Sequence, residues 1–148
     1  MVERDNWETP QEMWDLLHKQ YRFTFDCCAT QGNTKCLFFA SETFPFQNHT
    51  SIADVAWMNP PFSKAFEMFK HFFKVVKKGG AIYRCDNMET KVWQDIILPN
   101  CSWILIPKGR ISYTGFDGGG SRFPSALIGY NVDPPKFVDG MILHSFEE

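Results

Sequence analysis

The stretch ADVAWMNPPFS, residues 53–63, decides how this chain is expected to fold. Its first six residues form an apolar run typical of a buried strand, and Asn59-Pro60-Pro61-Phe62 follows directly. Two prolines cannot continue a hydrogen-bonded ladder, because neither has an N–H to donate and each fixes φ. The first proline also keeps the asparagine out of the helical region, and Ser63 is a good helix N-cap. The stretch therefore predicts a strand, a rigid extended turn and a helix, with the turn where open α/β sheets bind ligands.

The groups in this turn suit an amino group on a flat ring. The Asn59 side-chain oxygen and the Pro60 carbonyl can accept its two hydrogens, and Phe62 can stack on the ring. An exocyclic amine is a poor nucleophile because its lone pair is delocalised into the ring. Two acceptors out of the ring plane favour a pyramidal nitrogen that can attack a methyl sulfonium, which is catalysis by positioning and electrostatics. The alternative is an ordinary strand-to-helix loop that contains this sequence.

The rest of the chain alternates between strand and helix patterns. Thr9-Pro10-Gln11-Glu12 reads as a capping box with proline at the first helical position, opening a helix to about Gln20. The helix after Ser63 has phenylalanines at helical spacing, and Gly79-Gly80 is expected to end it. Further strands are expected at residues 23–28, 36–40, 81–85, 102–107 and 137–143, and a further helix at residues 90–98.

The C-terminal part is expected to close the sheet with a hairpin. Residues 111–114 and 126–130 read as its two strands, around a glycine-rich loop at residues 115–120. The alternation of strands and helices before it implies parallel pairing. The sequence therefore predicts a three-layer α/β domain with a mainly parallel sheet and a C-terminal antiparallel hairpin.

Composition limits the class of protein. A chain of 148 residues with 44% apolar residues, 15 phenylalanines and 22% charged residues is a single globular domain rather than a disordered segment. No apolar run approaches a membrane span, and the charged Glu3-Arg4-Asp5 is unlike a signal peptide. The five cysteines and four histidines have no ligand-like spacing. Buried free thiols are therefore favoured over zinc or disulfides, and no metal site is expected.

The charge pattern argues against a strong nucleic-acid binder. The net charge is −2, whereas strong DNA binders usually carry a basic face. A lysine cluster reads as the solvated face of a helix; it comprises Lys64, Lys70, Lys74, Lys77 and Lys78. Arg110 and Arg122 flank the glycine-rich loop and are better placed for phosphate contact. A chain with few phosphate contacts should bind DNA weakly, with a shallow salt dependence.

The chain resembles the phage-type DNA adenine methyltransferases, which are S-adenosylmethionine-dependent enzymes. The matching segments span residues 7 to about 130 and are Trp7-Glu8-Thr9-Pro10, Phe23-Thr24-Phe25-Asp26-Cys27-Cys28-Ala29-Thr30, Asn59-Pro60-Pro61-Phe62-Ser63, Gly109-Arg110-Ile111 and Phe123-Pro124-Ser125-Ala126. Many adenine-specific members have aspartate in place of Asn59, and Asn-Pro-Pro also occurs in enzymes that resemble glutamine and RNA-base methyltransferases. Cytosine, an RNA base or a protein glutamine therefore stay open as targets. A catalytically silent nucleic-acid-binding relative is an alternative of another class.

The resemblance implies a Rossmann-like methyltransferase fold with S-adenosyl-L-methionine as cofactor. It implies one catalytic domain over residues 1–148 without a separate target-recognition domain, in a phage protein that acts in the cytoplasm of a bacterial host. The target adenine in DNA would be flipped out of the duplex or single-stranded. The expected catalytic residues are Asn59, Pro60, Pro61 and Phe62.

The resemblance also implies two sets of binding residues. Cofactor contacts are expected from Trp7, Thr9, Pro10, Asp26, Cys27, Ala29, Glu42 and Asn59. Thr9 and Pro10 would bring a helix N-terminus to the cofactor carboxylate, and Glu42 could accept from ribose hydroxyls. Asp26 would end the first strand beside the methionine part of the cofactor, or else only cap the following segment. Nucleic-acid contacts are expected from Ser63, Lys64, Arg110, Tyr113 and Arg122.

Overall fold

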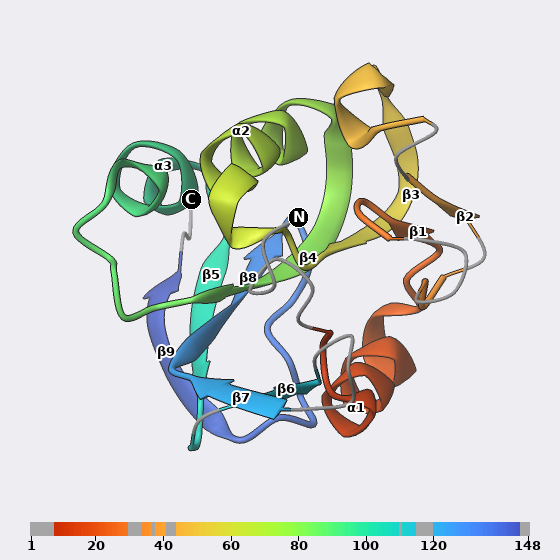
Figure 1. Ribbon diagram of the computed structural model, residues 1–148. Coiled ribbons are helices and arrows are strands. Elements are labelled where there is room, and N and C mark those ends of the chain that lie inside the picture. Colours follow the sequence, from red (N-terminus) through yellow and green to blue (C-terminus); the bar gives the residue numbers. More distant parts are fainter. Residues whose placement is uncertain are drawn as a thin grey trace.

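Seven strands form one mixed sheet in the order β2-β1-β3-β4-β8-β5-β9 (Figure 1). The computed structural model describes residues 8–29, 34–36, 38–40, 44–109, 111–114 and 120–145. The strands of this sheet are β1 Phe25–Asp26, β2 Phe38–Phe39, β3 Ile52–Met58, β4 Val76–Arg84, β5 Trp103–Pro107, β8 Ser125–Tyr130 and β9 Gly140–Ser145. Strands β1 to β4 pair in parallel, and β8, β5 and β9 pair antiparallel. The predicted α/β fold is confirmed, although the antiparallel part is larger than a hairpin.

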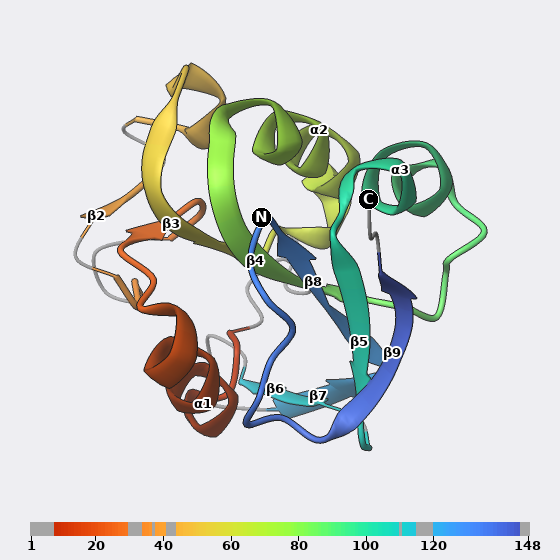
Figure 2. The ribbon, with the colours of Figure 1, turned by 180° about the vertical axis from the view of Figure 1, so that it is seen from behind.

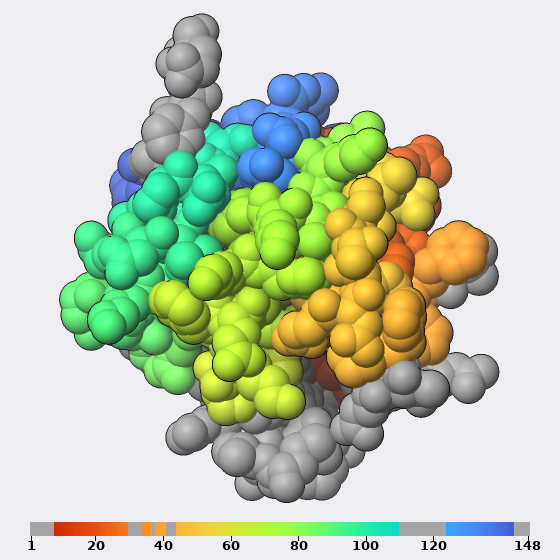
Figure 3. Space-filling model, turned by 90° about the horizontal axis from the view of Figure 1, so that it is seen from above, coloured from red at the N-terminus to blue at the C-terminus, as the bar shows by residue number. Residues whose placement is uncertain are grey.

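Helices cover both faces of the sheet and make the third layer (Figures 1 and 2). Helix α1 (Gln11–Tyr21) packs on one face, and α2 (Ala65–Val75) lies on the other with a π-helical turn η4 (Val92–Ile97) and α3 (Leu98–Asn100). Short 3-10 turns η2 (Phe46–Asn48) and η3 (Phe62–Lys64) precede β3 and α2. In the view from above, side chains of α2 occupy the middle of the molecular surface (Figure 3). No helix in the described ranges is long and apolar enough to cross a bilayer.

The central strands supply both cores by alternation, because successive side chains of a strand point to opposite faces. In β3, Ala56 and Met58 face α2 and the intervening Trp57 faces α1. In β4, Tyr83 faces α2 and Ile82 faces α1. Burial of two apolar faces holds the sheet between its helices.

The connection between α2 and β4 differs from the prediction. Gly79-Gly80 does not end the helix; α2 ends at Val75 and β4 begins at the next residue, so both glycines lie inside the strand. A Cβ at Gly79 would stand 2.3 Å from the carbonyl oxygen of Ala56 in β3. The glycine therefore permits a close approach of two strands. Lys77 and Lys78 consequently belong to a strand and not to a helix face.

Both predicted N-caps are wrong. Pro10 is the N-cap of α1, without a side-chain cap, and the hydroxyl of Thr9 has another partner described below. Ser63 lies inside η3, and Lys64 takes the N-cap position of α2. The Pro-Pro sequence favours a tight 3-10 turn before the α-helix, which moves the helix start beyond Ser63.

The predicted hairpin is also wrong in its pairing. Strand β6 (Ile111–Thr114) pairs with β7 (Gly120–Phe123) in a separate two-stranded ribbon, whereas β8 lies between β4 and β5. Strands β4 and β5 both run antiparallel to β8, so they run in the same direction. The ribbon therefore leaves the sheet on the side where the carboxyl ends of β3 and β4 lie. The Cys85 N–H donates to the Pro124 carbonyl at 2.8 Å and ties the base of the ribbon to the end of β4.

The remaining elements depart from prediction mainly at their ends. Strand β5 is confirmed within a residue, while β1 and β2 are shorter than residues 23–28 and 36–40. The helix expected at residues 90–98 is the π-helical turn η4 followed by α3. The strand expected at residues 137–143 is β9, shifted toward the C-terminus.

Candidate active site

Asn59 is held on both sides at the end of β3. Its side-chain Nδ2 donates to Thr9 Oγ1 at 3.1 Å, so the amide oxygen points away from Thr9. Its carbonyl accepts from Cys28 Sγ at 3.0 Å. Burial, followed by the nearby Asp26 charge, raises the pKa of the Cys28 thiol well above its usual range, so this thiol stays protonated and can donate. The lead-in to α1 and the segment after β1 thus fix the residue that directly follows β3.

The two prolines after Asn59 differ in what their carbonyls do. The Pro61 carbonyl accepts from the Lys64 N–H at 3.0 Å and opens the 3-10 turn. The carbonyl of Pro60, a buried residue, accepts no hydrogen bond from the part of the chain that the structure describes. The acceptor that the sequence assigned to Pro60 is therefore available, on the residue that directly follows Asn59.

Phe62 is half-buried between the core and a cation. The ring packs against the α2-side core, with the Tyr83 ring edge-on at 5.9 Å between centroids. The guanidinium carbon of Arg84 lies 5.3 Å from the ring centroid, a cation–π arrangement. Phe62 is thus a firmly packed aromatic surface beside Asn59.

Asp26 is a buried carboxylate at the carboxyl end of β1. It is 5% exposed and accepts from the N–H groups of Cys28 at 3.2 Å and Lys35 at 3.5 Å. Burial raises the pKa of Asp26 to about 7, against the lowering effect of those two N–H groups. The carboxyl group therefore caps the following segment, as the alternative reading held. Its raised pKa at a ligand-binding edge is also typical of a functional group.

The other predicted cofactor residues are less well placed or lie outside the described residues. The Cys27 side chain is in the α2-side core and its N–H donates to the Trp57 carbonyl, so neither faces a ligand. The Ala29 N–H likewise donates to the Ala40 carbonyl. Trp7 and Glu42 are outside the described residues.

The predicted nucleic-acid residues fall into two groups. Ser63 and Lys64 are exposed on η3, directly after the Asn59 turn. Arg110 lies outside the described residues, and only the main chain of Tyr113 and Arg122 is described, in β6 and β7.

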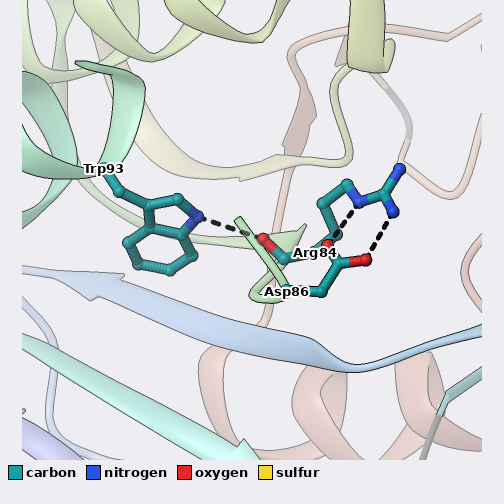
Figure 4. Close-up of polar contacts among 3 residues, drawn as sticks. All are labelled: Arg84, Asp86 and Trp93. Atoms are coloured by element: carbon teal, nitrogen blue, oxygen red, sulfur yellow. Dashed lines mark hydrogen bonds and ion pairs between the residues drawn. The ribbon is translucent and has the colours of Figure 1, made fainter. Parts of the chain in front are cut away.

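Sequence reasoning missed a cluster at the end of β4. Arg84 donates from Nε and Nη2 to the two carboxylate oxygens of Asp86, at 2.6 and 2.5 Å (Figure 4). The Trp93 indole N–H donates to the Arg84 carbonyl at 3.1 Å. The available signal was a pair of opposite charges at the end of an apolar strand. Without the strand order, nothing placed that pair beside Phe62.

A sheet whose parallel strands end in a buried carboxylate and an Asn-Pro-Pro-Phe turn defines the chain as an α/β enzyme of the methyltransferase class. Residues 1–123 match the family model of the DNA N-6-adenine-methyltransferases (Dam), and the chain belongs to that family. It is therefore a DNA adenine methyltransferase, and cytosine, RNA bases and glutamine give way to adenine as the target. The match ends at Phe123, before β8. No curated protein matches the chain.

Proposed function

We propose that the Asn59 turn is where this DNA adenine methyltransferase positions the amino group of its target base. The observation that carries the proposal is the hydrogen bond from Asn59 Nδ2 to Thr9, which turns the amide oxygen away from Thr9. With the Pro60 carbonyl, the turn would present acceptors from two consecutive residues to the two hydrogens of the amine. The amide is held by its hydrogen bond to Thr9 and the carbonyl belongs to a Pro-Pro turn with fixed φ angles, so little reorganisation is needed during the reaction.

The target adenine would enter the turn flipped out of the duplex or from a single strand. A base inside a duplex cannot reach a turn at the edge of a sheet, and extruding it costs a few kcal/mol. Stacking on Phe62 would return about 1–3 kcal/mol of this. Packing of Phe62 against the core supports this role, because a rigid ring loses little entropy when a base stacks on it.

The strand ends beside this turn would hold S-adenosylmethionine, the methyl donor that a methyltransferase of this family implies. The cofactor would supply the methyl group as a sulfonium. Asp26 would bind its ammonium group, because a buried carboxylate with a raised pKa gains most from a positive partner. The N-terminus of α1, at Pro10, would face its carboxylate. Trp7 and Glu42 stay predicted contacts of the remainder of the cofactor.

Target recognition would come from the β6–β7 ribbon, within one catalytic domain. Topology supports this, because the ribbon leaves the sheet at the same edge as the Asn59 turn, and the Cys85–Pro124 hydrogen bond fixes its base there. Arg110, Tyr113 and Arg122 would contact DNA from this ribbon, with Ser63 and Lys64 on the other side of the turn. The setting for this reaction would be the cytoplasm of a bacterial host of the encoding phage.

Substitution of Asn59 tests the proposal. Asn59→Ala should lower the rate of methyl transfer by about 100- to 1,000-fold, as loss of a preorganised polar group at a reacting centre does. Asn59→Asp should stay active, because a carboxylate accepts the same hydrogen bond. The measurement is N6-methyladenine in DNA from cells that express each variant, by nucleoside mass spectrometry. Calorimetry with S-adenosylmethionine shows whether the variant is folded. Wild-type methylation by Asn59→Ala would refute the proposal.

A further inference from the structure

The Arg84–Asp86 ion pair covers the aromatic ring on which the target base is proposed to stack. The pair is bidentate, yet the two side chains are 30% and 36% exposed. Because both side chains are open to water, another anion can reach the guanidinium, and one that forms the same two hydrogen bonds can replace the carboxylate. The Trp93 indole N–H anchors the main chain of Arg84 at its carbonyl, on the other side of the residue from the guanidinium and Asp86 (Figure 4).

The spacing between Arg84 and Phe62 excludes a base between them. The guanidinium carbon lies 5.3 Å from the ring centroid. A flat base needs about 3.5 Å of contact distance on each side, or roughly 7 Å in all. The ring already packs against the core, with Tyr83 at its edge. A base that stacks on the face under Arg84 must therefore displace the guanidinium.

We infer that Arg84 is a DNA-binding residue that covers Phe62 in the free protein and exchanges Asp86 for a phosphate of the target strand when the base enters. The inference rests on the proposed role of Phe62 as the stacking surface. Phosphate and carboxylate oxygens present the same bidentate acceptor geometry to a guanidinium, so the exchange conserves both hydrogen bonds. Asp86 keeps Arg84 neutralised and off other anions until DNA arrives.

The surroundings of the pair agree with a phosphate site. The N–H of Cys85, the residue between Arg84 and Asp86, donates a hydrogen bond to the Pro124 carbonyl at the base of the β6–β7 ribbon. The ion pair therefore lies between the proposed recognition ribbon and the proposed base site. The chain has a net charge of −2, so each single phosphate contact is a large share of its electrostatic attraction to DNA.

The salt dependence of DNA binding tests the inference. Fluorescence anisotropy would follow binding of a short duplex that contains an adenine methylated by the wild-type chain, between about 50 and 200 mM salt. Arg84→Ala should weaken binding and lower the slope of log K against log salt by about 0.9, which is the loss of one phosphate contact. Arg84→Gln, which keeps the stem, should lower the slope equally and serves if the alanine variant is unstable.

Lys78→Ala is the matched control. It removes the same charge from the same strand, six residues before Arg84, which is roughly 20 Å toward the opposite edge of the sheet. Its slope should equal that of the wild type. Asp86→Asn removes the competing carboxylate and should tighten binding at an unchanged slope.

Two outcomes would overturn the inference. If both Arg84 variants methylate more slowly but keep the wild-type slope of log K against log salt, Arg84 only positions Phe62 and does not contact a phosphate. Weaker binding by Asp86→Asn would mean that the ion pair binds DNA as a unit. Failure of the proposed function is seen separately, because it would show as wild-type methylation by Asn59→Ala and would leave these slopes measurable.

Discussion

The ends of β1 and β3 contrast with the end of β4, although all three strands stop at one edge of the sheet. At the ends of β1 and β3, the buried Asp26 carboxyl group accepts from main-chain N–H groups, and the Asn59 amide donates to Thr9 before α1. At the end of β4, two opposite charges are paired within reach of water. The carboxyl ends of these strands thus combine a fixed set of polar groups, suited to chemistry, with a water-exposed ion pair, which we infer to exchange with a phosphate.

The largest expected effect concerns the buried side of this contrast. Because the pKa of Asp26 is raised from 3.8 to about 7, the folded state keeps a proton that the unfolded state has lost. Stability should therefore fall as pH rises from about 4 to about 7, by on the order of 4 kcal/mol, and level off above. Asp26→Asn should lack this loss. The difference between the two urea-unfolding free energies, measured across this pH range, checks it.

The matched change on the exposed side is Asp86→Asn, which should keep the fall in stability between about pH 4 and 7, because Asp26 causes that fall. If Asp86→Asn abolished the fall in unfolding free energy between about pH 4 and 7, the contrast between the buried Asp26 and the exposed Asp86 would be wrong.

Cofactor affinity should separate the same two carboxylates. Asp26→Asn should weaken S-adenosylmethionine binding by roughly 1.5–3 kcal/mol, the contribution of a charged hydrogen bond. Wild-type affinity should rise with pH up to about 7, as Asp26 ionises and can pair with an ammonium group, whereas the variant should show no such rise. Calorimetry across this pH range measures both. Unchanged affinity in folded Asp26→Asn would exclude the carboxylate from the cofactor site.

A smaller effect is expected from the residue that orients the amide. Thr9→Val removes the acceptor of the Asn59 hydrogen bond while keeping the shape of the side chain. This should cost about 1 kcal/mol, or roughly a fivefold lower turnover rate. Thr9→Ser keeps a hydroxyl and should stay near the wild-type rate. Single-turnover methylation assays with saturating cofactor compare the pair. Equal rates for valine and serine would show that Thr9 does not position Asn59.

The features that sequence predicted here are those encoded over a few neighbouring residues. The end of β3 follows from an apolar run meeting two prolines. The position of Asp26 at the end of β1 follows from a similar local pattern.

The features that sequence missed depend on distant partners. A glycine pair can end a helix, or it can let two strands approach closely. At Gly79 the second applies, and this depends on the Ala56 carbonyl in the neighbouring strand, which the local sequence does not reveal. Thr9 fits a capping box, but the group that uses its hydroxyl lies 50 residues away. The insertion of β8 between β4 and β5 is a pairing that no local pattern encodes, and it is what brings Pro124 to Cys85.

The direct passage from α2 into β4 has a consequence for how this family can vary in length. With no connecting residue between Val75 and Val76, the last turn of the helix sets the register of the strand. One inserted residue there would turn every later side chain of β4 to the other face, sending Tyr83 toward α1 and Ile82 toward α2. Viable insertions should therefore be absent from this junction and gather in the surface loops, where added chain costs little.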